Sequence, residues 1–340
     1  MRAQASWCRS LGSPLYALLL TDAARDVESA GICWEVLEGR DTTPYGADDA
    51  LPLRFMGAVH RLVLEGQAPA LAPYYASVGG DPSRDGVRDA FRETVAANRH
   101  ELRGLIDRPV QTNEVGRSAV LAPSFLLVSR LTDLPLRLLE IGSSAGLNLR
   151  WDHYRYEIPG LTWGPPTSPV RFEDAYAEGR PPFEVPARVA ERCGCDLAPL
   201  DPQSPHDQLT LMSYVWPDQV ERAEALRGSF EIAKSVPAVV QRADAVEWAT
   251  AKLETLRPGV ATVLFHSFFI QYISAAKRAR LKEIIHMAGE RATSTAPFAW
   301  LCMEWGAKEA DVRLTTWPGH VERVVATANN QGRNIRWLAR

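Results

Sequence analysis

One stretch near the middle of the chain, residues 137–150, limits the possible folds more than any other. It reads R-L-L-E-I-G-S-S-A-G-L-N-L-R, an apolar run with one acid, Glu140, followed by a turn of glycines and serines and a second apolar segment. This pattern predicts a buried strand, a tight turn and a helix. In parallel sheets, the main-chain N–H groups of such a turn point at the space above the carboxyl end of the strand.

The turn consists of small residues, which would let a ligand approach the main chain: Gly142, Ser143, Ser144, Ala145 and Gly146. Its spacing matches neither the dinucleotide motif G-x-G-x-x-G nor the phosphate-binding motif G-x-x-x-x-G-K-S/T, and no lysine follows to hold a triphosphate. We expect a nucleotide or nucleoside as the ligand. The alternative is an ordinary strand-to-helix turn that binds nothing.

The composition is that of an ordinary soluble globular protein. Of the 340 residues, 46% are hydrophobic and 23% are charged, which suits one large domain or two modest ones. A formal net charge of -3 gives no electrostatic footprint for nucleic acid or a membrane surface. Because no apolar run approaches the roughly 20 residues that span a bilayer, we expect a cytoplasmic protein.

The cysteines predict no metal site and no disulfide framework. Their number, five, is odd, and Cys193 and Cys195 form the one close pair. A single residue separates these two, and no second pair lies at the spacing of a zinc site. Two buried thiols are the expected outcome.

Helical periodicity dominates the first part of the chain. Apolar residues recur every three or four positions over residues 51–65 and 84–106, which predicts a helical N-terminal domain over residues 1–110. A further helical pattern over residues 112–131 leads into the strand before the glycines, and it opens with the polar run Q-T-N-E-V-G-R. We expect Asn113, Glu114 and Arg117 to line the ligand cleft. The alternative is a solvated helix start with an asparagine cap.

After the turn the pattern changes to alternation of apolar and polar residues. This predicts a β-hairpin inserted at about residues 151–186. In nucleoside-binding sheets, the second strand ends in an acid that accepts hydrogen bonds from ribose, usually about 20 residues after the glycines. Asp196 follows much later, and the insertion would account for the surplus. Asp201 is the reserve candidate, and either acid could instead cap the helix expected over residues 207–227.

Further strand–helix units complete the pattern. A short strand ends near Asp244, and the most strand-like run of the chain, residues 260–265, ends at His266. The last predicted strands are joined by Pro318 and Gly319 in a hairpin. Alternation of this kind indicates a parallel sheet covered by helices on both faces, with the ligand crevice at the carboxyl ends of the strands. We therefore predict an α/β domain over residues 111–340.

Motifs throughout the chain resemble the bacterial family catalogued as domain of unknown function 2332. They include A-V-H-R-L-V-L-E-G-Q-A-P-A-L, Q-T-N-E-V-G-R, E-I-G-S-S-A-G-L-N-L-R, W-D-H-Y-R-Y, E-R-C-G-C-D-L-A-P-L-D-P and S-Y-V-W-P-D-Q. This resemblance covers nearly the whole chain and implies no particular reaction.

Residues 137–326 are also similar to class I S-adenosylmethionine (SAM)-dependent methyltransferases. That resemblance implies a seven-stranded, mostly parallel, Rossmann-like sheet and SAM as the cofactor. The residues that it would place on the cofactor are Glu140, Gly142, Ser143, Ser144, Gly146, Asp196, Asp244 and Ala245. Two features depart from the methyltransferase pattern, because Ser144 replaces the middle glycine and the second-strand acid is displaced. An N-P-P-Y motif is absent, which argues against methylation of nucleic-acid bases.

Methyl transfer requires alignment of acceptor and methyl group, and removal of a proton when the acceptor is an alcohol or amine. Histidine titrates near neutral pH, so His266 is the candidate base; the alternative is a histidine anchored structurally. The candidate acceptor-binding residues are Asn113, Arg117, Tyr154, Gln271 and Tyr272. We predict a SAM-dependent methyltransferase for a small molecule, with the N-terminal helices closing over the acceptor. Alternatives are a methyltransferase-like protein that binds SAM or another nucleoside without catalysis, and a nicotinamide-dependent oxidoreductase, which lacks its expected motif.

Overall fold

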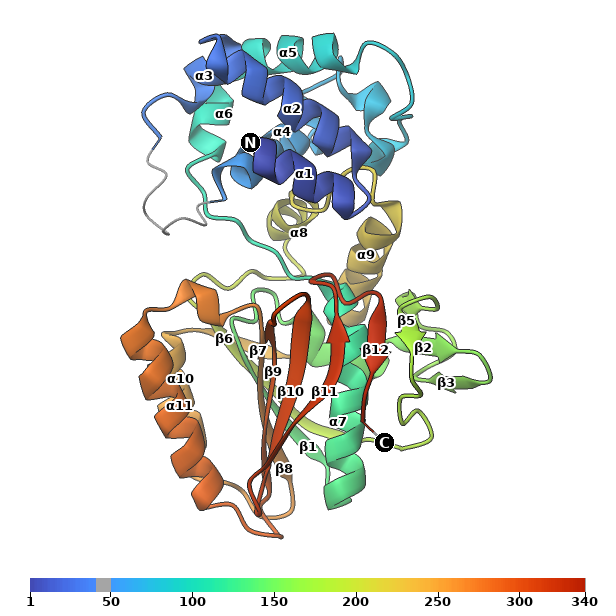
Figure 1. The fold of residues 1–340 in the computed structure, drawn as a ribbon, viewed down its shortest axis with the longest axis vertical. Coiled ribbons are helices and arrows are strands. Elements are labelled where there is room, and N and C mark those ends of the chain that lie inside the picture. Colours follow the sequence, from blue (N-terminus) through green and yellow to red (C-terminus); the bar gives the residue numbers. More distant parts are fainter. Residues whose placement is uncertain (41–49, 340) are drawn as a thin grey trace. The chain divides into compact units, whose positions relative to one another are not determined.

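The computed structural model describes residues 1–40 and 50–339, which form two compact units (Figure 1). The helical unit comprises Met1–Thr112 and Pro205–Glu224, and the α/β unit comprises the rest of the described chain. The second segment of the helical unit lies in the part of the sequence that we assigned to the α/β domain. None of the helices within the described ranges is both long and apolar enough to cross a membrane.

The helical unit is built around one apolar helix, α4. Its helices are α1 (Arg2–Ser10), α2 (Pro14–Glu28), α3 (Ile32–Leu37), α4 (Leu51–Leu64), α5 (Val87–Ala97), α6 (Arg99–Leu105) and α8 (Pro205–Ser213), with short 3-10 turns η2 (Ala72–Tyr74) and η3 (Ala76–Val78). Phe55, Val59 and Leu62 of α4 are fully buried in the core. A methyl group at Gly57 would lie 2.7 Å from the Tyr214 ring, so Tyr214 packs directly on the α4 backbone. This contact explains why residues 205–224 belong here.

One predicted helix is divided in two. Residues 84–106 form α5 and α6, which are separated at Asn98. The Asn98 side chain donates a hydrogen bond to the carbonyl of Thr94 at 2.9 Å. Asparagine competes for main-chain groups in this way and favours helix ends.

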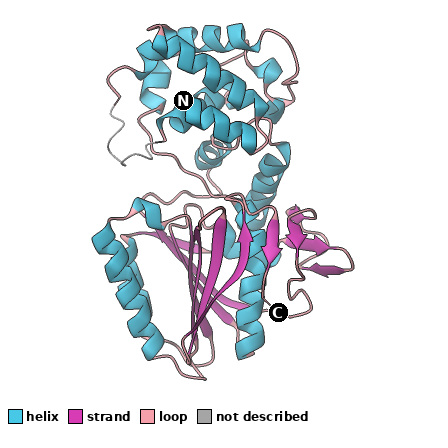
Figure 2. Ribbon diagram, viewed as in Figure 1, coloured by secondary structure: helices cyan, strands magenta, loops and turns pink. Residues whose placement is uncertain are grey.

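The α/β unit contains a nine-stranded sheet in the order β5-β12-β11-β10-β9-β8-β1-β6-β7. Its strands are drawn in magenta in Figure 2. Five neighbouring strands are parallel: β7 (Val239–Arg242), β6 (Val189–Asp196), β1 (Leu136–Ile141), β8 (Ala261–Ser267) and β9 (Phe298–Trp305). Numbered along the chain, they run third, second, first, fourth, fifth, which is the order of doubly wound nucleotide-binding sheets. The direction of winding reverses between β1 and β8, and ligands bind at the carboxyl ends of strands at such a point.

The other strands extend this sheet beyond the predicted seven. They are β10 (Ala310–Trp317), β11 (Val321–Ala328), β12 (Ile335–Trp337) and β5 (Tyr176–Glu178). The first three are antiparallel to their predecessors, and β5 pairs in parallel with β12. The prediction of seven strands was wrong because β5 and β12 have only three residues each, too few for a periodic pattern.

Helices cover both faces of the sheet, as the alternation predicted. On one face, α10 (Ala245–Leu253) and α11 (Ala275–Glu290) pack on Leu139 and Ile141 of β1. On the other face lies α7 (Ser118–Thr132), whose Phe125 contacts Phe265 of β8 edge to face. The α/β fold with N-terminal helices is thereby confirmed.

The segment after the turn departs from a regular strand–turn–helix unit. In place of the predicted helix is a seven-residue 3-10 helix, η5 (Leu147–His153), which kinks at Arg150. A small separate sheet follows, in the order β3-β2-β4, from β2 (Arg155–Ile158), β3 (Leu161–Trp163) and β4 (Arg171–Phe172). The chain then joins one edge of the main sheet at β5 and continues to β6, beside β1.

Candidate functional site

The glycine turn, residues 142–146, lies at the carboxyl end of β1, beside the point where the winding reverses. The N–H groups of Gly142 and Ser143 donate to the carbonyl of Cys195 at 2.9 and 3.1 Å, which fastens the turn to β6. Gly142 and Gly146 have φ of 68° and 66°, and Ser144, with φ of 52°, also adopts the left-handed conformation. That conformation is strained for a residue with a side chain, and such strain clusters at functional sites.

Protein side chains fill the space beside the two glycines. A methyl group at Gly142 would lie 2.7 Å from the Phe269 ring, and one at Gly146 would lie 2.8 Å from a methyl group of Val240. Packing and the positive φ therefore account for glycine at both positions. That these two residues also contact a ligand stays a prediction.

Asp196, at the end of β6, reaches the glycine turn although it lies 52 residues from Ser144 in the sequence. Its Oδ2 accepts a hydrogen bond from the Ser144 N–H at 2.9 Å, and its Oδ1 accepts one from the Ala198 N–H at 2.9 Å. Each carboxylate oxygen can accept a second hydrogen bond, so Asp196 retains capacity for a ligand hydroxyl. The reserve candidate, Asp201, accepts from the N–H of Gln203 in a local turn.

Glu140, just before the turn, is a buried acid that the protein does not fully satisfy. Its side chain is 3% exposed, and its Oε2 has no hydrogen-bond partner among the described residues. Burial raises the pKa of Glu140 well above its ordinary value, and the negative charge of Asp196 adds to this effect. The positive charges of Arg117 and Arg150 act in the opposite direction. Two acids and two guanidinium groups therefore influence one another at this edge of the sheet.

Arg117 and Asn113 lie at the same edge, where their polar groups hold protein segments together. Arg117 Nη1 donates to the hydroxyl of Ser267 at 3.2 Å, Nε donates to the carbonyl of Asn330 at 3.0 Å, and the guanidinium lies 4.6 Å from the centre of the Phe268 ring. Asn113 Oδ1 accepts from the N–H of Leu147 at 2.9 Å and thus caps η5. Arg117 and Asn113 therefore join segments of the protein at the edge where we expected the crevice.

His266 is fully buried, and both of its ring nitrogens are engaged. The indole N–H of Trp300 donates to Nε2 at 3.2 Å, and Nδ1 lies 2.8 Å from Oε1 of Glu304. Because indole only donates, Nε2 is the acceptor, and Nδ1 must carry the proton given to Glu304. No ring lone pair remains for a substrate. This placement favours the alternative, a structurally anchored histidine, over a catalytic base.

Asp244 caps a helix. Its Oδ1 accepts from the N–H groups of Val246 and Glu247 at the start of α10, and its Oδ2 lies 2.6 Å from Nζ of Lys277. The hydrogen bond from Lys277 lowers the pKa of Asp244. The sequence D-A-V-E carries the signature of a capping box, with an acid three residues after the cap. Asp244 and the following Ala245 therefore have a structural role that this signal could have revealed.

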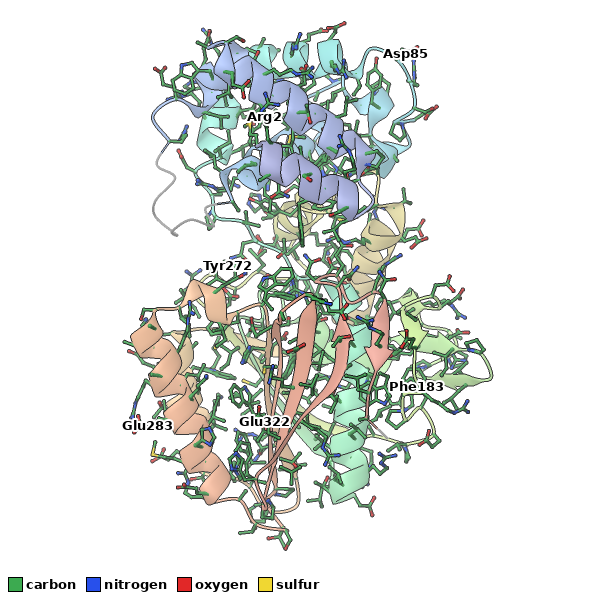
Figure 3. The ribbon with its side chains drawn as sticks, in the orientation of Figure 1. Arg2, Asp85, Phe183, Tyr272, Glu283 and Glu322 are labelled. Atoms are coloured by element: carbon green, nitrogen blue, oxygen red, sulfur yellow. The ribbon has the colours of Figure 1, made fainter. Side chains whose placement is uncertain are left out.

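The other three predicted acceptor-pocket residues, Tyr154, Gln271 and Tyr272, do not form one pocket. The hydroxyl of buried Tyr154 donates to the carbonyl of Leu147 at 2.6 Å, which ties the insertion to η5. Gln271 and Tyr272 lie in the short η6 (Ile270–Tyr272), where both are exposed, Tyr272 at 70% (Figure 3). Of the predicted acids, Asp196 bonds to the glycine turn and Glu140 directly precedes it.

The cysteines, Cys193 and Cys195 included, are buried and form no disulfide bond. Within the described residues, no three histidine, cysteine or acidic side chains gather closely enough to hold a metal ion.

Comparison with known proteins identifies the family of the chain. No curated protein matches the chain. A family model described as "Uncharacterized protein conserved in bacteria (DUF2332)" matches residues 1–337, which include the glycine turn, both acids and the helical unit. Because this match covers almost the entire sequence, the chain belongs to the bacterial DUF2332 family.

Proposed function

We propose that the α/β unit binds SAM at the glycine turn and that the chain is a SAM-dependent methyltransferase acting on a small molecule. The observation that carries the proposal is the buried Glu140 carboxyl group, whose Oε2 lacks a partner among the described residues. It stands directly before the turn, at the reversal point where doubly wound sheets bind ligands. An unsatisfied buried carboxyl group costs stability, and such groups persist where a ligand supplies the missing partner.

The Glu140 Oε2 atom, which lacks a partner among the described residues, favours a cationic ligand over a phosphate. SAM carries an ammonium and a sulfonium group, and an ammonium would give Glu140 a charge-assisted hydrogen bond. Asp196 is already oriented by the N–H of Ser144 and could accept from the ribose hydroxyls. A nucleotide phosphate offers only acceptors and a negative charge, and so would not supply the donor that the Glu140 oxygen lacks. NAD and ATP are therefore poorer candidates.

The arrangement also restricts the acceptor. SAM, when bound, supplies an activated methyl group, and the protein contributes alignment of the acceptor. Both nitrogens of His266 are engaged, so the proposal includes no histidine base. Acceptors that need no proton removed, such as a carboxylate, therefore fit better than alcohols or amines.

A second candidate is a protein that binds SAM or another nucleoside without catalysis. The observation that favours it is the same full engagement of His266, together with the capping role of Asp244. A binding protein requires the glycine turn and its acids but no group that acts on an acceptor.

Thermal unfolding with SAM, S-adenosylhomocysteine, NAD and ATP tests the proposal, because a ligand that binds only the folded state raises its apparent stability. We expect both SAM-related compounds to stabilise the protein and the other two to have no effect. The Glu140→Gln variant should bind SAM about ten-fold or more weakly, because it loses a charged partner. Glu283→Gln, on the exposed face of α11, is the matched control. Stabilisation by NAD alone would overturn the proposal.

Transfer of a labelled methyl group from SAM to compounds in a bacterial metabolite extract separates the two candidates. A labelled product that requires the native chain supports the methyltransferase. Tight SAM binding without any labelled product supports the binding protein.

A further inference from the structure

A second site opens on the other half of the α/β unit. A cleft of about 390 Å³ lies between four segments of this unit: the end of α7, the β2–β3 hairpin, residues 180–184 and the last residues of the described chain. Its size is within the range of clefts that hold small ligands. The insertion after the glycine turn supplies two of its four walls, and Figure 1 shows α7 and β12 as neighbours there.

This cleft is built on rigid supports. Pro181 and Pro182 form part of one wall, and the neighbouring Phe183 is buried against the ring of Tyr176 at a centroid distance of 5.6 Å. The indole N–H of Trp163 donates to the carbonyl of Val185 at 2.9 Å and holds the end of the same segment. A preformed cleft binds its ligand without the entropic cost of ordering the walls.

The walls combine an apolar surface with an excess of positive charge. Leu127, Leu161 and Trp337 contribute apolar groups. Arg130 lies 3.9 Å from Glu184, while Arg180 has no carboxylate partner among the described residues. Two guanidinium groups thus face one carboxylate in the same cleft.

An exposed leucine of α7 lies one helical turn from Leu127. Leu131 is 58% exposed and follows Leu127 by four positions on α7, so both occupy one face of the helix. Exposed apolar surface beside a concave site is typical of ligand-binding regions.

The cleft is separate from the glycine turn. Ser118, at the start of α7, donates a hydrogen bond to Asn148 just after the turn, whereas Arg130 lies in the last turn of the same helix. A rise of about 1.5 Å per residue puts the main chain of Ser118 and that of Arg130 about 18 Å apart. The inference about this cleft therefore does not depend on the proposed function.

We infer that this cleft binds a small amphipathic anion, with its apolar body against Leu127, Leu161 and Trp337 and its acidic group between Arg130 and Arg180. Both a carboxylate and a phosphate can form paired hydrogen bonds with guanidinium groups. The apolar walls require a hydrocarbon body of modest length, because the cleft has the volume for a small ligand only.

Calorimetric titration of the full chain with four probes of equal chain length tests the inference: octanoate, octyl phosphate, octanol and octylamine, each below its micellar concentration. We expect saturable one-to-one binding of at least one anion, with octanol about ten-fold or more weaker and octylamine weaker still. The ratio of octanoate to octyl phosphate affinity identifies which acid the cleft prefers. Octanol binding as tightly as both anions, or no binding of either anion, would overturn the inference.

Variants then locate the binding. Arg180→Ala should weaken the anion about ten-fold while leaving octanol binding unchanged, and the exposed position of Arg180 makes loss of folding unexpected. Arg280→Ala, an exposed arginine of α11 paired with Glu283, is the matched control and should bind as the native chain does. Glu140→Gln should also leave octanoate binding unchanged, which distinguishes this cleft from the glycine turn. Unchanged anion affinity in Arg180→Ala would exclude the site as described.

Discussion

Two buried polar side chains lie near the same edge of the sheet, Glu140 on the α7 face and His266 on the α11 face. They differ in how many hydrogen-bond partners the protein gives them. Glu140 pairs across the sheet with Phe265, which packs on α7, and keeps an oxygen without a partner among the described residues. His266 has a partner for each ring nitrogen. A fully satisfied group contributes mainly to stability, whereas an unsatisfied one is available to a ligand. The comparison moves the candidate site from the histidine to the acid.

The largest expected effect tests whether His266 is structural. His266→Ala leaves a cavity and removes the partners of Glu304 and Trp300, so we expect a loss of about 3 kcal/mol in the free energy of unfolding. Urea unfolding followed by circular dichroism measures it. His100→Ala, at an exposed position of α6, is the control and should change stability by less than about 0.5 kcal/mol. If His266→Ala lost as little stability as the control, the hydrogen bonds of His266 would not be structural, and its ring could act on a ligand.

A smaller effect of opposite sign is expected for Glu140→Gln. The variant removes a buried charge, and we expect it to raise the free energy of unfolding at pH 8 by about 2 kcal/mol. The pKa of Glu140 is raised in the folded state, so its contribution is fully present below the unfolded pKa and is lost as pH rises toward the folded pKa. The difference between native chain and variant should therefore shrink toward pH 5.

Unfolding curves for the native chain and Glu140→Gln at several pH values between 5 and 8 measure this change. The exposed pair member Glu283, replaced by Gln, serves as the control. A stability difference that does not depend on pH would show that Glu140 is already satisfied in the folded protein, and the contrast with His266 would disappear.

Asp244 extends the comparison to a second acid, which pairs with Lys277 of α11. Asp244→Ala should cost about 1 kcal/mol through loss of the α10 cap, whereas Lys277→Ala should cost clearly less, because Lys277 is 54% exposed. The lowered pKa of Asp244 gives stability that is present above the unfolded pKa and is lost as pH falls through the folded pKa. Thermal unfolding near neutral pH and below about pH 4 checks both statements. Equal effects of the two variants would mean that the ion pair, and not the cap, dominates.

The smallest effect concerns the strain at Ser144. Ser144→Gly relieves the left-handed conformation but adds freedom to the unfolded chain, so we expect a net gain of about 0.5 kcal/mol. The bond to Asp196 uses the main-chain N–H and should persist. Chemical denaturation measures the change. A clear loss of stability would show that the serine side chain contributes more than its backbone strain costs.

Local patterns predicted the elements better than their details. Apolar periodicity identified α4, and the glycine turn identified the end of β1. Each of these signals consists of residues that are close together in the sequence. The prediction of a regular helix after the turn was wrong, because residues 147–153 form a 3-10 helix. The first N–H group of this helix donates a hydrogen bond to Asn113. The hydrogen bond to Asn113 joins residues 34 positions apart, and no local pattern contains that information.

The sequence by itself determined the alternation of strands and helices, and thereby a parallel sheet with a turn and an acid at the carboxyl end of its central strand. Only the tertiary structure decided which polar groups are satisfied. The register of β8 and β9 sets His266 opposite Cys302, with Trp300 and Glu304 two residues to either side on the same face. Hydrogen bonds have a short range, so the partner of a buried side chain depends on which strands become neighbours and in what register. That arrangement left His266 satisfied and Glu140 without a full set of partners.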